Sequence, residues 1–259
     1  MENKVIAISK LGQEEIVLNK LEDSIYLIDK SVNIKVINGI NVKVIDTLND
    51  GNVSIDVEEG SSVDYYSVST KNTNKSFNVD GEIRFIGISL DKTDEKFEVS
   101  LNKENSSFNL KLLSIAKNLK SNYYFNVIHN NKYTFSNIEN VGVAKDNGSI
   151  NFEVIGKINK GMAKSRCSQI SRGVVMDDDS EVLAKPILLI DEFDCFANHG
   201  AAIGKISDEN LFYMMSRGLT KDESVLLILQ GMINPYVENI PLDSFKEDLK
   251  NRLNLLIER

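Results

Sequence analysis

Short runs in which apolar and polar residues alternate make up most of the chain as far as about residue 205. In Val53-Ser54-Ile55-Asp56-Val57, for example, every second side chain is apolar, which is the pattern of a strand with one buried face. The runs recur at spacings of roughly 8 to 14 residues, with turn residues such as Asn38-Gly39 and Asp146-Asn147-Gly148 between them. The same pattern is found at residues 34–36, 42–44, 76–79, 97–101, 108–112, 124–127, 133–135 and 150–154.

This repetition predicts an all-β core, which could be a sandwich, a barrel or a solenoid. Helical periodicity is nearly absent from the first 205 residues, which argues against a doubly wound sheet of alternating strands and helices. No exact repeat is present, so a solenoid built from this sequence would have coils of unequal length.

Helical periodicity begins at Ser207. Ser207 followed by Asp208 and Glu209 is typical of a helix N-terminus, because the hydroxyl caps free N–H groups and the helix dipole favours acidic residues there. Arg217-Gly218 is typical of a helix C-terminus. One face of this predicted helix carries Leu211, Phe212 and Met215.

Two further helices are expected. Thr220-Lys221-Asp222-Glu223 is a capping box that opens a helix expected to run through Leu229 to Gly231. Pro235 and Pro241 bracket a break, and Asp243 begins a third helix with apolar residues at spacings of 4, 4 and 3. These residues are Phe245, Leu249, Leu253 and Leu256. The sequence therefore predicts a β domain over residues 1–205 and a helical domain over residues 206–259.

Charge and composition exclude several classes of protein. The formal net charge of −8 and the pI near 5.0 make nucleic acid a poor partner. No run approaches the 18 or more apolar residues of a transmembrane span, and the first residues lack the pattern of a signal peptide. Two cysteines in 259 residues do not make a disulfide scaffold and suit a reducing compartment. We therefore expect a cytoplasmic protein that binds neither nucleic acid nor membrane.

Few residues suggest chemistry. The sequence has no glycine-rich phosphate loop, no zinc-protease motif and no serine-hydrolase motif. His129 is followed by two asparagines, which predicts a surface turn. Asp177-Asp178-Asp179 is interpreted as a solvated turn because no calcium-loop spacing surrounds it. Cys167 is expected to be a small buried side chain, although the neighbouring Arg166 would favour a reactive thiolate.

The densest group of potential metal ligands lies between Asp191 and Ala202. It includes Cys195 and His199, which offer a thiol and an imidazole of the kind that iron or zinc binds. On one strand these two residues would share a face but lie about 13 Å apart, too far for one metal ion. The spacing thus favours a structural role, or a contribution to a site that another chain completes.

Three stretches resemble the C-terminal core of the SufB/SufD family, which serves the SUF system of iron–sulfur cluster assembly. They are Ala184-Lys185-Pro186-Ile187-Leu188-Leu189-Ile190, Ala197-Asn198-His199-Gly200-Ala201-Ala202-Ile203-Gly204-Lys205-Ile206 and Glu209-Asn210-Leu211-Phe212-Tyr213-Met214-Met215-Ser216-Arg217-Gly218-Leu219. Upstream, Ala163-Lys164-Ser165 and Gln169-Ile170-Ser171-Arg172-Gly173 are similar to the same family. The likeness covers roughly residues 160 to 240.

The resemblance implies a right-handed parallel β-helix followed by a short helical region that docks a SufC ATPase. It also implies pairing with a second SufB/SufD-type subunit, as a homodimer or a heterodimer. The histidine that matches His199 lies at that contact, where a transient iron–sulfur cluster would be assembled. Cys195 is a weaker candidate ligand on its own chemistry, because the resemblance implies no role for it. The residues implied for the ATPase contact are Tyr213, Met214, Arg217, Gly218 and Leu219. Those implied for the seam between subunits are Lys185, Pro186, Leu188, Ile190, His199 and Ile203.

Some features depart from the family pattern. Members are commonly longer at the N-terminus, Ser180 stands where SufB-type members have a cysteine, and Cys195 stands where many relatives have an apolar residue. The chain is therefore closer to a SufD-type or a compact SufB/SufD subunit.

The resulting hypothesis is a non-enzymatic scaffold with no tightly bound cofactor in the isolated chain. The alternative is a β-solenoid binding module unrelated to iron; a polysaccharide-cleaving β-helix enzyme would need paired carboxylates on adjacent coils.

Overall fold

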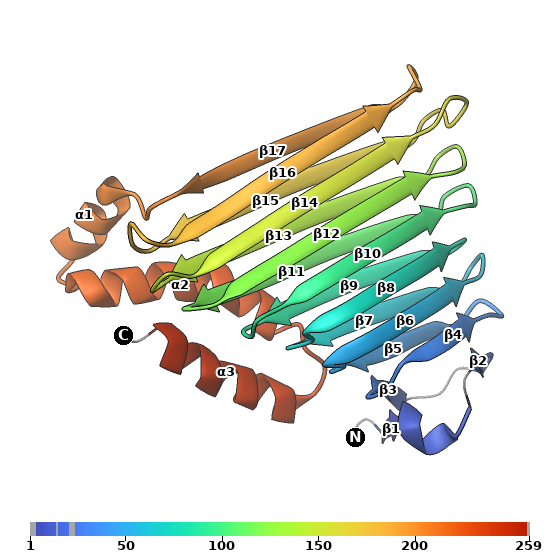
Figure 1. The fold of residues 1–259 in the computed structure, drawn as a ribbon, viewed down its shortest axis with the longest axis horizontal. Helices are drawn as coiled ribbons and strands as arrows, with labels where there is room; N and C mark the ends of the chain where they lie inside the picture. Colours follow the sequence, from blue (N-terminus) through green and yellow to red (C-terminus); the bar gives the residue numbers. More distant parts are fainter. Residues whose placement is uncertain (1–3, 14, 21–23, 258–259) are drawn as a thin grey trace.

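Parallel strands that alternate between two sheets form the chain from Lys4 to Gly204 (Figure 1). The computed structural model describes residues 4–13, 15–20 and 24–257. The first sheet contains β1 (Lys4–Ala7), β3 (Ser24–Ile28), β5 (Asn41–Asp46), β7 (Ser62–Val68), β9 (Glu82–Ser89), β11 (Ser107–Lys117), β13 (Phe135–Lys145), β15 (Arg166–Val175) and β17 (Phe196–Gly204). The second sheet contains β2 (Glu15–Leu18), β4 (Val32–Val36), β6 (Asp50–Val57), β8 (Asn72–Val79), β10 (Asp94–Leu101), β12 (Lys120–His129), β14 (Ser149–Ile158) and β16 (Glu181–Ile190).

Each strand pairs in parallel with the strand two places further along the chain. Ile25 pairs with Lys43 near the N-terminal end, whereas Ser136 pairs with Cys167 near the C-terminal end. The coil therefore lengthens along the molecule, which explains why the sequence shows no fixed repeat. The architecture confirms the predicted all-β core as a parallel, β-helix-like solenoid with a helical end. The right-handed sense of the coil stays a prediction.

The interior of the β-helix is filled by every second side chain of both sheets. In β8 the inward residues are Thr73, Lys75, Phe77 and Val79, all of them buried. Aromatic rings stack between neighbouring coils; the ring centroids of Tyr65 and Phe85 lie 4.8 Å apart. The alternation that defined the strands in the sequence is thus the alternation between interior and solvent.

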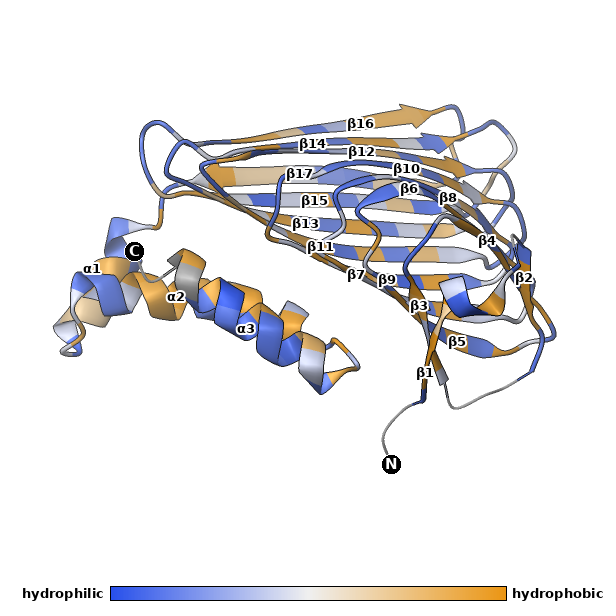
Figure 2. Cartoon of the chain, turned by 60° about the horizontal axis from the view of Figure 1, so that its bottom comes forward, coloured by the Kyte–Doolittle hydropathy of each residue, from blue (hydrophilic) through white to orange (hydrophobic). Residues whose placement is uncertain are grey.

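A second apolar core lies between the outer face of the first sheet and the helices (Figure 2). The helices are α1 (Asp208–Ser216), α2 (Lys221–Val237) and α3 (Asp243–Ile257). The helix side chains buried in this core are Leu229, Ile233, Tyr236, Val237, Leu249 and Leu253. The sheet residues beneath them are Ile25, Ile45, Val68, Ile88, Leu113, Ile115, Val141 and Val143. Because the helices cover this part of the sheet, apolar side chains also occupy outward-facing strand positions beneath them. The division into domains at residue 205 stays a prediction.

The expected helix caps are confirmed. The Ser207 side chain accepts a hydrogen bond from the Asn210 N–H, and Thr220 and Glu223 form the reciprocal contacts of a capping box. The predicted end of the second helix was wrong, because α2 continues past Gly231 and through Pro235 to Val237. Ile233, Tyr236 and Val237 bury their side chains against the sheet, and this burial outweighs the backbone hydrogen bond that Pro235 cannot donate.

Three smaller predictions were also wrong. The run at residues 133–135 is not a strand throughout, because Tyr133 has φ 55° in a turn and β13 begins at Phe135. We expected all helices to lie beyond Ser207, but a short 3-10 turn, η1 (Ile8–Leu11), lies near the N-terminal end; every α-helix of the described residues begins at or after Asp208. His129 lies at the end of β12 and is fully buried, because the next coil stacks over it.

No helix in the described part of the chain is long and apolar enough to cross a membrane.

Candidate functional site

The last coil, formed by β16 and β17, is the open end of the β-helix (Figure 1). Among the described residues, β16 pairs only with β14 and β17 only with β15, so each has one edge without a partner strand. Residues of this coil that would be buried in an inner coil are therefore partly exposed. Of the seam residues expected from the sequence, Pro186, Leu188 and Ile190 are half-buried, Ile203 is 42% exposed, and Lys185 points outward to Glu153 at 3.1 Å.

His199 occupies an inward-facing position of this uncovered coil. It pairs with Gln169, which pairs with Ile138, and both of these side chains are buried. The imidazole of His199 is exposed because no further coil covers it. Ile138, Gln169 and His199 thus lie side by side on three neighbouring strands. The first two side chains are buried, and the last presents a ring nitrogen to solvent.

Unsatisfied polar atoms lie directly below this open coil. Gln169 Nε2 donates a hydrogen bond to the Ile187 carbonyl at 3.3 Å, but Gln169 Oε1 has no hydrogen-bond partner. Asn198 Oδ1 in β17 also has no partner, but Asn198 faces the opposite side of the sheet from His199. A buried acceptor without a donor is costly, so the open end holds acceptors that a further donor would stabilise.

Cys167 and His129 form a separate buried polar group around Ser136. Cys167 is 1% exposed, and burial raises the pKa of its thiol despite contacts with Ser136 and Gln169 that favour the thiolate. His129 Nδ1 lies 2.7 Å from Thr134 Oγ1 and its Nε2 lies 2.9 Å from Ser136 Oγ. Burial lowers the pKa of His129 to about 4, so its ring is neutral at physiological pH. The expectation that Cys167 is buried is confirmed.

Cys195 lies in the bend just before β17. Its Sγ donates to the Glu192 carbonyl at 3.1 Å. Partial burial and the nearby Glu192 and Asp194 carboxylates raise the pKa of the Cys195 thiol, so the thiol stays protonated near neutral pH. Within the described residues, no three His, Cys, Asp or Glu side chains are placed to hold a metal ion. The described residues therefore offer isolated potential ligands.

The residues expected at the ATPase contact lie on and after α1. Tyr213 and Arg217 are exposed, and the guanidinium lies 5.3 Å from the centroid of the Tyr213 ring. Met214 and Leu219 are half-buried, and Gly218 has φ 98°, which favours glycine at a helix end. Besides Tyr213, two apolar side chains of α1 are exposed, Phe212 at 74% and Met215 at 46%. The sequence placed these two on one helix face but did not identify them as contact residues.

Sequence reasoning also missed a buried ionic cluster in the N-terminal half of the β-helix. Lys75 is fully buried, contacts Glu95 and lies 3.4 Å from Asp46. Tyr65 donates to Asp46 at 2.5 Å, and Thr73 donates to Glu95 at 2.7 Å. Burial disfavours a charged lysine, but the two carboxylates raise the pKa of Lys75. The signal was present, because Lys75 shares the inward parity of Phe77 and Val79.

Comparison with known proteins identifies the family. Residues 19–232 match the family model of the SUF system FeS cluster assembly, SufBD core domain. The chain is 38% identical over 128 residues to the iron-sulfur cluster assembly protein SufD of Bacillus subtilis, covering 49% of this chain and 29% of that protein. It is 33% identical over 132 residues to an iron-sulfur cluster assembly SufBD family protein of Mycobacterium bovis, covering 51% of this chain and 15% of that protein.

A third relative is an iron-sulfur cluster assembly SufBD family protein of Pyrococcus horikoshii, 33% identical over 104 residues, or 39% of this chain and 23% of that protein. The match thus spans less than a third of the length of each of these relatives. The family match itself extends over most of the β-helix and into α2. The chain belongs to the SufBD core family of the SUF system for iron–sulfur cluster assembly.

Proposed function

We propose that this chain is a non-enzymatic scaffold subunit on which iron–sulfur clusters are assembled as cargo. The observation that carries the proposal is the open last coil, where the exposed imidazole of His199 lies on the uncovered inner face of β17, next to its register partner Gln169 with the unpartnered Oε1 atom. The chain has no finished metal site among its described residues, so a second subunit would complete the ligand set. The two free thiols, Cys167 and Cys195, fit a reducing cytoplasmic location.

The second subunit would pair with the free edges of β16 and β17. Exposed strand edges carry unpaired backbone groups that accept a further strand, and a two-fold arrangement would bring His199 of each copy to the seam. The apolar side chains of this end, including Leu183 and Leu189 at 48% exposure each and Phe196 at 59%, would be covered at the same time. A homodimer and a heterodimer with a paralogue both satisfy this geometry.

The ATPase would dock on α1. Phe212, Tyr213 and Met215 expose apolar surface around the Arg217 guanidinium, which combines the aromatic and arginine side chains that are enriched at protein interfaces. This surface is separate from the open coil, so one chain could hold both partners.

Two experiments test the proposal. The first is co-purification with a SufC-type ATPase of the double variant Phe212→Asp, Tyr213→Asp. We expect loss of the complex with an unchanged melting temperature, whereas Val17→Asp, which alters an apolar residue 48% exposed at the other end, leaves the complex intact. An intact complex with the double variant would show that α1 is not the contact.

The second experiment reconstitutes the assembled complex with ferrous iron and sulfide and records the cluster absorbance. His199→Ala should lower the absorbance, and Asn78→Ala, an exposed substitution on the second sheet, should not. Cys195→Ser tests the weaker candidate ligand separately. Wild-type absorbance from His199→Ala in an intact complex would assign His199 a structural role only.

A further inference from the structure

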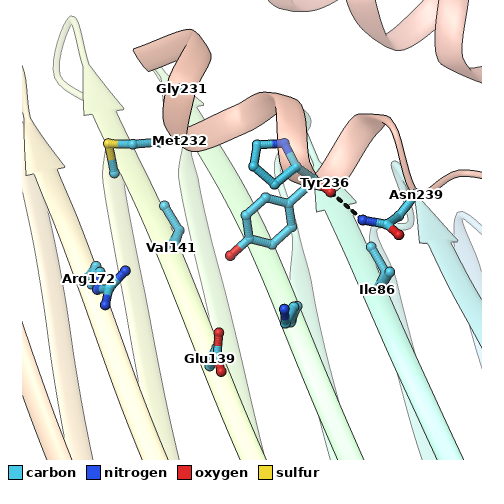
Figure 3. A pocket seen from close by; sticks show the side chains of 10 residues that line it. Ile86, Glu139, Val141, Arg172, Gly231, Met232, Tyr236 and Asn239 are labelled. Atoms are coloured by element: carbon cyan, nitrogen blue, oxygen red, sulfur yellow. Dashed lines mark hydrogen bonds between the residues drawn. The ribbon is translucent and has the colours of Figure 1, made fainter. Parts of the chain in front are cut away.

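A cavity of about 330 Å³ lies between α2 and the outer face of the first sheet, and it extends as far as β15, the neighbour of β17 (Figure 3). Its apolar wall includes Ile86, Val141 and Met232. Its polar wall includes Lys111, Glu139, Arg172 and the Tyr236 side chain, whose hydroxyl points toward the cavity. Small-molecule sites in proteins are typically apolar hollows of this size or larger with a few convergent polar groups.

The cavity wall carries more positive than negative side chains. Lys111 and Glu139 are register partners on neighbouring strands, and Arg172 lies on the next strand, β15. Glu139 accepts a hydrogen bond from Asn137 Nδ2 at 2.9 Å. In the part of the chain that the structure describes, neither Lys111 nor Arg172 is within ion-pair distance of a carboxylate. The wall thus holds two cations and one anion in a protein of net charge −8.

Tyr236 adds a neutral hydrogen-bond donor. Burial, together with the Glu139 carboxylate, raises the pKa of Tyr236 to about 12, although Arg172 opposes this change. The phenol therefore keeps its proton at physiological pH and can donate it to an acceptor in the cavity.

Ile86 of β9 offers a way to fill the cavity. Its side chain lies in the apolar wall and is only partly buried, so a larger side chain at this position would extend into the cavity.

We propose that this cavity binds a small molecule with an apolar body and one anionic group. The apolar body would lie against Val141 and Met232, and the anion would lie between Arg172 and Lys111 and accept a hydrogen bond from Tyr236. A carboxylate, a phosphate and a sulfonate share the required chemistry. The site lies on the outer face of the first sheet, whereas His199 lies on the inner face of β17.

The test uses the full chain and two fluorescent probes, the anionic 8-anilinonaphthalene-1-sulfonate and its neutral analogue N-phenyl-1-naphthylamine. We expect one saturable sulfonate site per chain, and a neutral probe that binds at least about tenfold more weakly. Arg172→Gln should weaken the sulfonate about tenfold and Lys111→Gln several-fold. Lys96→Gln, which removes an exposed cation from the second sheet, should change the affinity less than twofold.

Filling the cavity gives a second, charge-independent readout. Ile86→Trp should abolish the saturable phase, and Ile86→Val should keep it, with circular dichroism and melting temperature used to confirm that both variants are folded. The proposal is overturned if folded Ile86→Trp binds the sulfonate like wild type, or if Arg172→Gln and Lys111→Gln do. Equal affinity for the neutral probe would remove the anionic group from the proposal and so refute it as stated.

Discussion

Lys75 Nζ lies 3.4 Å from Asp46 Oδ2 inside the β-helix, where neither side chain is accessible to solvent. Burial raises the pKa of Asp46, and Lys75 and the hydroxyl of Tyr65 oppose this change. Glu95 contacts the same ammonium from the next coil. Burying charged side chains costs desolvation free energy, and only a strand register that brings Lys75 next to Asp46 and Glu95 offsets this cost. We infer that the cluster specifies the alignment of β5, β8 and β10.

Lys75→Met should therefore destabilise the protein strongly. The change leaves Asp46 and Glu95 buried without their cation, which typically costs about 3–5 kcal/mol of the free energy of unfolding. Urea unfolding at pH 7 measures the loss. The matched control is Lys35→Met, because Lys35 pairs with Glu15 on the surface, where water screens the pair, and its loss should change the stability far less. Similar losses in the two variants would contradict the inferred role of the cluster.

His129 should make the protein less stable in acid. Its pKa is lowered from 6.5 to about 4 by burial, so between these values the unfolded chain binds a proton that the folded chain does not. The stabilisation is complete above pH 6.5 and is lost as the pH falls toward 4, by about 3 kcal/mol in all.

Urea unfolding at pH 7 and pH 4.5 measures this effect, with His129→Gln as the comparison. Glutamine has no titrating ring and can still bond Thr134 and Ser136. The variant should lose less stability than wild type over the same interval. If both proteins show the same pH dependence, other groups carry it.

The two cysteines should differ in reactivity. Cys167 is buried with a raised thiol pKa, whereas Cys195 is only partly buried in the bend before β17. In the native protein we expect a disulfide reagent to label one thiol promptly and the other on the order of 100-fold more slowly, because Cys167 reacts only when the structure opens. Cys195→Ser should remove the fast phase and Cys167→Ser should keep it. Two fast thiols would show that the interior is open to solvent.

Leu249→Ala should loosen the helical layer. The Leu249 side chain is fully buried between α3 and the first sheet, and its truncation typically costs about 2–5 kcal/mol. Leu227→Ala, at a leucine 47% exposed on α2, should cost less than about 0.5 kcal/mol. Hydrogen exchange should show the larger effect in α3 and in the outer face of the first sheet. Equal exchange in the two variants would contradict this packing.

The sequence predicted which side chains face inward more reliably than which strands pair. Alternation around Phe77 or Val99 follows directly from burial of one strand face, and the Ser207 and Thr220 caps act through local hydrogen bonds. Which strands pair depends on whether a turn leads the chain back to the same sheet or across to the other one. Asn38-Gly39 has φ 66° and 70°, as expected for a turn, yet it connects strands of different sheets and not the two strands of a hairpin.

The candidate site was only partly predictable for the same reason. His199 and Tyr213 were identified from the family resemblance, whereas local spacing alone favoured a structural role for His199. His129 was misplaced because its burial is caused by the following coil, which is remote in sequence from the turn-like Asn130 and Asn131. The cavity under α2 needed the helix to continue through Pro235, which local propensity opposes.

α2 and α3 cover strands that are synthesised before them, so this apolar core can form only after the helices have been made. Their apolar faces cover strand positions from Ile25 to Val174, and Arg252 bonds Ser69 and Asp91 at 2.8 and 2.7 Å. A growing chain makes these strands long before it makes their cover. A nascent β-helix therefore presents a bare apolar face to the ribosome surface and to chaperones until its last turn of helix is released.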